Sequence, residues 1–311
     1  MTAALICGSL AYDTIMVFPD QFKNHILPDK VHILNVSFLV PRMRREFGGC
    51  AGNIAYNLHL LGGAPLPMAT VGADFGPYRQ HFSELGIPLT HVKEIADLYT
   101  AQAFITTDLD DNQITAFHPG AMMRSYENHV RDVPGVGFGI VGPDGYEAML
   151  QNCTEFAECG IPFIFDPGQA MPLYNGEELR RMIDQATYVT VNDYESSLLQ
   201  ERTGWSAEDI AKKVKAYFIT RGPKGSEVHT PDGMIHIPSA TAMRVVDPTG
   251  CGDAYRAGLI FGFMKGLDLA TTGRIASLMG ALKIEQLGPQ NQRFDYAEFA
   301  EQFRQQFGYA L

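Results

Sequence analysis

The chain has 311 residues, of which 46% are apolar and 19% are charged, which is ordinary for a soluble globular protein with room for one large α/β domain. Its formal net charge of −11 argues against binding nucleic acid or an anionic membrane, because both require a concentrated positive surface. The five cysteines are odd in number and contain no Cys-x-x-Cys pair, so we expect neither a zinc site nor a disulfide framework. There is also no basic leader and no apolar run of about 20 residues, so we expect a cytoplasmic protein without a membrane span.

The first predicted strand covers residues 3–11, and Asp13 lies just beyond its carboxyl end. Ligands of open α/β sheets bind beyond the carboxyl ends of strands, which makes Asp13 a candidate binding residue. A turn aspartate after Gly8-Ser9 would give the same pattern, so both interpretations stay open on the residues alone.

Two stretches, 14–47 and about 98–120, show strand patterns without helices. The most β-prone piece of the first is 31–40, and the second holds a predicted hairpin of 101–107 and 113–117. Strands that follow one another without a crossover helix do not fit a parallel sheet, so these stretches do not belong to a parallel core.

The diglycine Gly48-Gly49 precedes a predicted helix that carries its apolar side chains on one face and stops at 62–63. Asn53 belongs near the amino end of this helix. Glycines allow a ligand to approach the backbone closely, although an ordinary turn explains the diglycine equally well.

From residue 64 onward, strands alternate with helices. The predicted pairs are 68–72 with 78–85, 136–141 with 146–159, 162–166 with 177–185, and 188–191 with 195–203. This alternation predicts a parallel sheet covered by helices on both faces. The chain has no Gly-x-x-x-x-Gly-Lys-Ser/Thr motif, which argues against a P-loop kinase.

Two further stretches lie after predicted strands. Asn192-Asp-Tyr-Glu195 begins a helix, a position that suits either a ligand contact or a purely structural helix start. Residues 216–226 form a predicted strand and a glycine loop, followed by a hairpin around 231–233. The last predicted helices are 270–282 and 296–307.

The stretch Asp247-Pro-Thr-Gly-Cys-Gly-Asp253 precedes an almost wholly apolar run over 254–264, which places Asp253 in the first turn of a buried helix. Unpaired backbone N–H groups converge there and the helix end carries about half a positive elementary charge, so we predict an anion site. A carboxylate beside an anion site suits a base that deprotonates an attacking hydroxyl. The alternative is an aspartate that only caps the helix.

Residues 247–253 closely resemble the carboxy-terminal signature of the ribokinase (PfkB) family of carbohydrate and nucleoside kinases, and 47–63 resemble its amino-terminal signature. The two lie roughly 200 residues apart in the expected order, and the resemblance covers essentially the whole chain. It implies a single ribokinase-like α/β domain over 1–311, with a mostly parallel sheet flanked by helices. It also implies a small β-sheet lid, formed by about 14–47 and 98–120, that closes over the substrate.

The resemblance assigns roles to residues at the matching positions. Asp253 corresponds to the catalytic base, and the backbone of Gly250, Cys251 and Gly252 to the anion hole. Cys251 stands where the family usually has alanine or another very small residue, but its N–H group is kept. Positions that contact substrate hydroxyls are matched by Asp13, Gly48, Gly49 and Asn53.

The family pattern also implies a nucleotide site for ATP with Mg²⁺. Asn192 and Glu195 match a motif that places magnesium through waters, which suits an ion that keeps several of its waters. The loop 283–289, with Gly288, matches the cover of the adenine, and a monovalent cation such as K⁺ is implied beside Asp247. The phosphates are expected to contact Thr220, Gly222 and Gly225.

The whole pattern looks more like the prokaryotic adenosine and broad-specificity nucleoside kinases than like ribokinase proper. We therefore expect ATP-dependent phosphorylation of the 5′-hydroxyl of a nucleoside, with apolar lid residues covering the base. The same apolar residues would equally fit a small core of the lid itself. The candidate base contacts are Phe104, Asn112, Gln113, Phe117, Met122 and Met123.

Three alternatives stay open. A free sugar would be the substrate of a ribokinase-like or fructokinase-like enzyme. Arg42, Arg44 and Arg45 could instead bind the phosphate of a sugar phosphate, since arginine binds phosphate bidentately. A non-catalytic nucleoside sensor is disfavoured, because Asp253 and both anion-hole glycines are intact.

Two further expectations concern chemistry and assembly. A thiol at a helix amino terminus should have a lowered pKa, so we expect Cys251 to be reactive. Exposed strand edges in the lid favour a homodimer joined through the lid.

Overall fold

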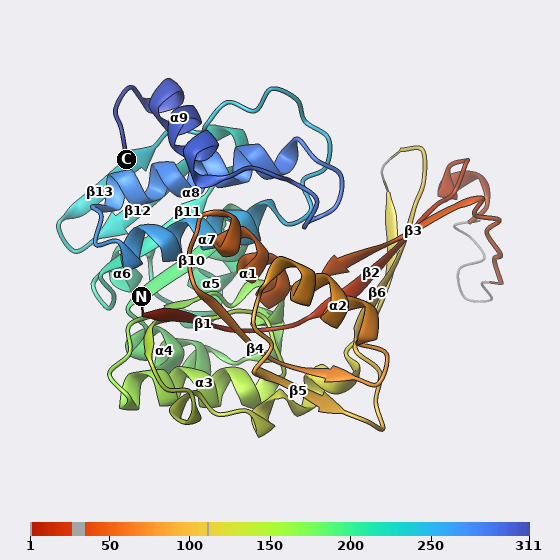
Figure 1. Ribbon diagram of the computed structural model, residues 1–311, viewed down its shortest axis with the longest axis horizontal. Helices are drawn as coiled ribbons and strands as arrows, with labels where there is room; N and C mark the ends of the chain where they lie inside the picture. The colour runs from red at the N-terminus through yellow and green to blue at the C-terminus, as the bar shows by residue number, and fades with distance from the viewer. Residues whose placement is uncertain (1, 27–34, 111) are drawn as a thin grey trace.

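The computed structural model describes residues 2–26, 35–110 and 112–311 (Figure 1). The central sheet has the strand order β13-β12-β11-β10-β9-β8-β1-β4-β5, and all neighbours from β11 to β5 are parallel. β12 and β13 form an antiparallel hairpin at one edge. The strands are β1 (Ala3–Cys7), β4 (Pro65–Gly72), β5 (His91–Ile95), β8 (Val136–Val141), β9 (Phe163–Phe165), β10 (Tyr188–Asn192), β11 (Ala216–Thr220), β12 (Ser226–Thr230) and β13 (Gly233–Ile237).

Helices cover both faces of this sheet, as the βα alternation predicted (Figure 1). One face carries α1 (Cys50–Leu60), α2 (Gly76–Leu85), α7 (Cys251–Met264), α8 (Leu269–Ile284) and α9 (Tyr296–Phe307). The other carries α3 (Tyr146–Glu158), α4 (Gly176–Gln185), α5 (Asp193–Thr203) and α6 (Ala207–Ala211). Each face of the sheet has its own apolar core. Helix α7 packs closely on α8, because Gly258 has no side chain and lies directly against the backbone of Ala276.

A smaller sheet of order β3-β2-β6-β7 projects from one side of the central sheet (Figure 1). β2 pairs antiparallel with β3 and parallel with β6, and β6 and β7 form the predicted hairpin. These strands come from the two stretches predicted to lie outside the parallel core. They are β2 (Ala11–Val17), β3 (Arg42–Gly48), β6 (Ala101–Thr107) and β7 (Gln113–His118).

Two strand predictions were wrong in part. The strand predicted over 3–11 is interrupted after Cys7, and Ala11 begins β2 of the smaller sheet. The interruption frees the carbonyl oxygen of Ser9, which accepts from the N–H of Ala51 at 3.0 Å and so holds the first turn of α1. Residues 35–40 of the predicted strand 31–40 form no regular element, and 31–34 lie outside the described residues.

No helix in 2–26, 35–110 or 112–311 combines the length and the hydrophobicity that crossing a membrane requires.

Candidate active site

Asp253 lies in the first turn of α7, as its sequence context predicted. Gly250 precedes the helix with φ of 81°, a left-handed conformation that residues with side chains rarely adopt. A β-carbon at this position would also lie 2.7 Å from Cβ of Pro289. Both backbone conformation and space therefore require glycine in the turn that leads into α7.

The start of α7 offers amide groups to a ligand. In the part of the chain that the structure describes, the N–H groups of Gly250, Gly252 and Asp253 donate to no protein acceptor. The N–H group of Cys251, by contrast, donates to the carbonyl oxygen of Pro248 at 3.1 Å. The unpaired amides and the positive end of the helix dipole thus converge next to the Asp253 carboxylate.

The carboxyl of Asp253 is tuned toward proton transfer near neutral pH. Burial raises its pKa to about 6, against the opposing charge of Arg256 and a hydrogen bond from Asn53. In that hydrogen bond, Nδ2 of Asn53 donates to Oδ2 of Asp253 at 2.8 Å. A carboxyl with this pKa is ionised at pH 7, yet it accepts a proton more readily than an exposed aspartate does.

A series of side-chain hydrogen bonds fixes Asn53. Its Oδ1 accepts from Nε2 of Gln290 at 2.9 Å, which leaves Nδ2 to face Asp253. Nε2 of Gln290 also donates to the hydroxyl of Tyr78 at 2.7 Å, and this hydroxyl donates to the carbonyl oxygen of Gly48 at 2.9 Å. The sequence analysis identified Asn53 but missed Gln290 and Tyr78, because neither residue belongs to a motif.

Asp13 lies in β2 with its carboxylate against Gly48, the first glycine of the diglycine that precedes α1. Burial raises the pKa of Asp13 to about 6, and the neighbouring carboxylate of Glu46 acts in the same direction. A β-carbon on Gly48 would collide with the Asp13 carboxylate, and Gly49 has φ of 83° with backbone atoms of 9–11 against it. Local geometry therefore requires both glycines of the diglycine.

A buried ion cluster lies close to Asp253. Arg256, one turn further along α7, is 7% exposed, and its guanidinium binds both carboxylate oxygens of Asp166, with Nη2 and Oδ1 2.7 Å apart. Nη2 also lies 3.9 Å from Oε2 of Glu195. Burial raises the pKa of Glu195, and the charge of Asp166 adds to this effect. The sequence analysis missed Asp166 and Arg256, although an arginine inside the apolar run 254–264 was a usable signal.

The residues predicted to bind ATP gather at the carboxyl ends of β10 and β11. Asn192 and Glu195 form a reciprocal capping box at the start of α5, with N···O distances of 2.7 and 2.8 Å, so the motif has a structural role. Thr220 ends the neighbouring strand, and Gly222 and Gly225 follow with φ of 53° and 85°. Their contacts with a nucleotide stay a prediction.

Asp247 connects the turn before α7 to the loop predicted to cover the adenine. Its Oδ1 accepts from the N–H of Thr249 and its Oδ2 from the N–H of Gly288, both at 2.9 Å. Burial opposes the ionisation of Asp247, but these hydrogen bonds outweigh it and the pKa is lowered.

The register of the smaller sheet places the predicted contacts to the nucleobase on two different faces of that sheet. Ala103 of β6 pairs with Asp13 on one side and with Phe117 on the other, so Phe117 shares the Asp13 face of the sheet. Gln113 lies on this face as well, by the alternation of β7. Phe104 follows Ala103 and therefore points to the opposite face.

Asn112 has a structural partner. Its Nδ2 donates to both carboxylate oxygens of Asp108, at 3.1 and 3.2 Å, in the turn between β6 and β7. The geometry of the sheet thus favours Gln113 and Phe117 as substrate contacts over Phe104 and Asn112.

The register of β3 places Arg42 and Arg44 on one face of the smaller sheet and Arg45 on the other. Nη2 of Arg44 lies 3.7 Å from Oδ2 of Asp247, on the Asp13 face of the smaller sheet. Arg45 points to the opposite face, where its guanidinium carbon lies 3.7 Å from the ring centroid of Tyr12. This register separates Arg45 from the other two arginines, so Arg45 does not join them in a phosphate site on the Asp13 face.

The expectation of a lowered pKa for Cys251 is wrong. Burial raises the pKa of the thiol to about 11, which the nearby charge of Lys283 reduces only in part. The loss of hydration is the largest cause, and the charges of Asp247 and Asp253 raise the pKa further.

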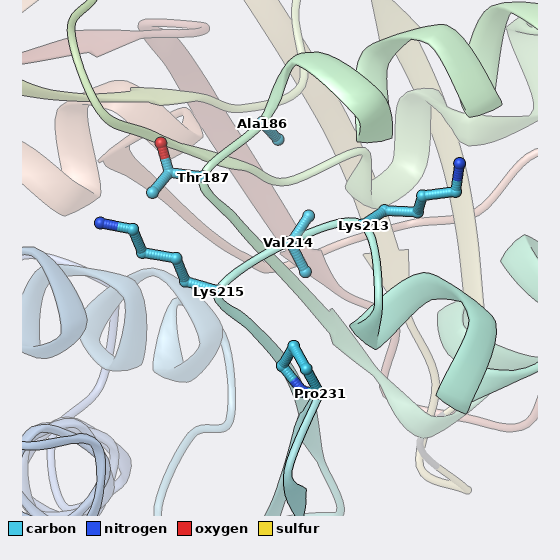
Figure 2. Close-up of a pocket in the computed structure, with 6 residues that line it drawn as sticks. All are labelled: Ala186, Thr187, Lys213, Val214, Lys215 and Pro231. Carbon is cyan, nitrogen blue, oxygen red and sulfur yellow. The ribbon is translucent and has the colours of Figure 1, made fainter.

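A surface pocket lies next to the amino ends of β10 and β11, whereas the candidate site lies at the carboxyl ends of the strands. Figure 2 shows that the side chains of Lys213 and Lys215 point away from one another, and Lys213 is paired with Asp184 at 3.3 Å. Because the candidate site lies where these strands end, we assign no catalytic role to this pocket. Its lining residues are Ala186, Thr187, Lys213, Val214, Lys215 and Pro231.

Phosphoryl transfer to a hydroxyl needs a proton acceptor and a place for the charge of the moving group, and the start of α7 brings a carboxyl and unpaired amides together. On this sheet architecture, such a site defines a ribokinase-like phosphotransferase. The chain belongs to the pfkB family of carbohydrate kinases, whose model matches residues 12–294. The family resemblance of 47–63 and 247–253 is therefore confirmed, and the acceptor of the phosphoryl group is an alcohol.

Relatives of known structure match nearly the whole chain. The chain is 54% identical to Burkholderia thailandensis nucleoside kinase in complex with inosine, over 99% of each chain, with a TM-score of 0.91. A second structure of that kinase, in complex with ADP-inosine, matches with 56% identity over 99% of this chain and 97% of that chain, with a TM-score of 0.89. The nucleoside kinase of Methanothermobacter thermautotrophicus is 31% identical over 98% of this chain and 96% of that protein.

Proposed function

We propose that this protein transfers the γ-phosphoryl group of ATP to the 5′-hydroxyl of a nucleoside. The observation that carries the proposal is the start of α7, where a carboxyl with a pKa of about 6 adjoins unpaired amide groups. A proton acceptor and an anion site within one helical turn suit transfer to a hydroxyl. The similarity to a nucleoside kinase solved with inosine and with ADP-inosine supports a nucleoside as the acceptor.

In the proposed reaction, Asp253 accepts the proton of the hydroxyl while the hydroxyl oxygen bonds to the γ-phosphorus. The bond to the bridging oxygen breaks, and ADP leaves with its electron pair. The amides of Gly250 and Gly252 face the charge on the transferring oxygens, together with the positive end of α7. The amide of Cys251 joins them only when its hydrogen bond to Pro248 opens.

Mg²⁺ would enter with ATP and neutralise charge on its phosphates. Among the described residues, no cluster of three or more His, Cys, Asp or Glu side chains is arranged to bind a metal ion by itself. The carboxylate of Glu195 would contact the ion through its waters with Oε1, because Oε2 of Glu195 accepts from the N–H group of Asn192 and both carboxylate oxygens of Asp166 are bound by Arg256. The remaining nucleotide contacts are proposed for Thr220, Gly222, Gly225 and Gly288.

The acceptor would lie between the start of α7 and the Asp13 face of the smaller sheet. There, Asp13 and Asn53 would hold ribose hydroxyls, and Gly48 and Gly49 would leave room for the sugar. Closure of the smaller sheet would bring Phe117 and Gln113 toward the base and exclude water that would otherwise hydrolyse ATP.

The opposite face of the smaller sheet supports a homodimer joined through the lid. It carries Met43, Phe104 and Ile114, which are 70%, 41% and 44% exposed, and β7 leaves one sheet edge unpaired within the described residues. Phe104→Glu should convert such a dimer to monomers in sedimentation analysis.

The function is tested by measuring ADP release from Mg-ATP with adenosine, inosine, guanosine, cytidine, ribose, fructose or fructose 6-phosphate. We expect turnover with nucleosides. Turnover with ribose or fructose alone would replace the nucleoside by a free sugar and leave Asp253 as the base. No turnover with any acceptor, together with nucleoside binding by calorimetry, would identify a sensor and contradict the proposal.

A further inference from the structure

Lys283 is a buried lysine next to the anion site. It lies in the last turn of α8 and has an exposed fraction of 0%. Its Nζ donates to the backbone carbonyl oxygen of Asp247 at 2.8 Å and to that of Gln286 at 3.0 Å. Burying an ammonium group is unfavourable unless polar groups replace its water, so these two carbonyl oxygens provide its main compensation.

The two carbonyl groups belong to the segments that build the anion site. Asp247 begins the turn that leads to Gly250, and Gln286 belongs to the loop that follows α8, a helix that extends to Ile284 and so beyond the predicted end at 282. The side chain of Lys283 passes beneath this turn, because its Cε lies 3.7 Å from the position that a β-carbon on Gly250 would take. The ammonium group therefore joins the turn before α7 to the loop after α8.

The same place was expected to hold a monovalent cation. Backbone carbonyl oxygens are typical ligands of K⁺, but here those of Asp247 and Gln286 already accept from Lys283. Both carboxylate oxygens of Asp247 also accept backbone N–H groups. A further cation at these oxygens would lie against the ammonium group, so the residues present do not fit bound K⁺.

We infer that the ammonium group of Lys283 takes the place of a monovalent cation beneath the anion site. In this role it holds the turn before α7 and the loop after α8 together, and it adds one positive charge near the amino end of α7. Lys283 is a positioning residue, since it reaches the reacting groups only through the backbone of 247–250. The kinetic part of this inference rests on the proposed kinase function, and its consequence is turnover that does not depend on K⁺.

The kinetic test compares KCl, NH₄Cl, NaCl and tetramethylammonium chloride at one ionic strength. The wild-type rate of ADP release should agree within about twofold in all four salts. Lys283→Ala leaves a cation-sized space, so its turnover should fall about tenfold or more in tetramethylammonium chloride and recover in KCl or NH₄Cl. Lys283→Met removes the charge but fills the space, so its loss should not recover in any salt.

Lys265→Ala serves as the matched control, because Lys265 is an exposed lysine just after α7. This variant should behave as the wild type in all four salts. Stimulation of the wild type by K⁺ of about tenfold or more would overturn the inference, as would a Lys283→Ala variant that keeps full turnover in tetramethylammonium chloride.

A second readout needs no substrate. The Tm of ligand-free Lys283→Ala should rise when KCl replaces tetramethylammonium chloride, because an ion that binds only the folded state stabilises it. The Tm of the wild type and of Lys283→Met should not change. This result would stand even if no nucleoside were turned over, whereas a Tm of Lys283→Ala that is insensitive to K⁺ and NH₄⁺ would contradict the inference whatever the enzyme phosphorylates.

Discussion

Asn53 of α1 and Asp253 of α7 meet in a hydrogen bond of 2.8 Å between Nδ2 and Oδ2, across 200 residues of sequence. Gln290 donates to Oδ1 of Asn53, so the amide cannot turn over without losing that bond. The hydrogen bond lowers the pKa of Asp253 against the effect of burial. A residue expected to contact the substrate therefore also adjusts the pKa of the carboxyl proposed as the base.

Replacing Asn53 should change the pH dependence of the reaction. Asn53→Ala removes a donor to the ionised form of Asp253, so the pKa of Asp253 should rise and the acidic limb of kcat/KM should move to higher pH. Asn57→Ala is the matched control, since the side chain of Asn57, one turn along α1, bonds the backbone oxygen of Asn53 and Nε2 of Gln292 but does not contact Asp253. If Asn53→Ala changed KM with the acidic limb unmoved, Asn53 would act on the substrate alone.

The wild-type enzyme should lose activity as the pH falls through about 6. Burial raises the pKa values of Asp253 and Asp13 to about 6, and the base cannot accept a proton once it is protonated. The two carboxyls interact, so the acidic limb reports the pair and not one residue. The measurement is kcat/KM for ATP and a nucleoside between pH 4.5 and 8.

Asp253→Asn should keep substrate binding but lose turnover by at least about 10². Calorimetry with nucleoside and with ADP separates binding from chemistry. Near-normal turnover in this variant would remove Asp253 from the role of base, and Asp253 would then be the helix cap that its sequence position also allowed.

The sequence predicted β4, β8, β9 and β10 of the central sheet well because each of these strands is followed along the chain by a helix, a local pattern that tertiary contacts reinforce. It failed where the chain changes sheets. Between Cys7 and Ala11 the strand is interrupted, and the carbonyl oxygen of Ser9 accepts a hydrogen bond from the N–H group of Ala51 in α1. This contact joins residues far apart in the sequence, so no local pattern predicts it.

The candidate site was predictable where function requires a motif, as in 47–53 and 247–253. Gln290 and Lys283 gave no signal, because their importance depends on burial against residues far away in the sequence. The separation of Phe104 from Phe117 also depends on strand register, which the hairpin sequence alone left open.

Arg256 should be necessary for stability because it neutralises Asp166. Arg256→Met leaves the Asp166 carboxylate buried without its partner, so the free energy of unfolding should fall by about 3–5 kcal/mol. The double variant Arg256→Met, Asp166→Asn removes the uncompensated charge and should regain much of this loss. Urea unfolding at pH 7.5 measures both changes, and equal destabilisation of the single and double variants would contradict the electrostatic explanation.

The thiol of Cys251 should react slowly with alkylating agents at neutral pH. Its pKa of about 11 leaves little thiolate at pH 7.5, whereas Cys159 is exposed at the end of α3, away from the site. One equivalent of iodoacetamide should therefore label Cys159 first and leave activity intact, as peptide mass spectrometry and ADP release would show. Cys159→Ser provides the control, since this variant should resist labelling and inactivation under the same conditions. Rapid inactivation of Cys159→Ser at pH 7.5, with the label on Cys251, would mean that the field of the α7 amino end outweighs burial after all.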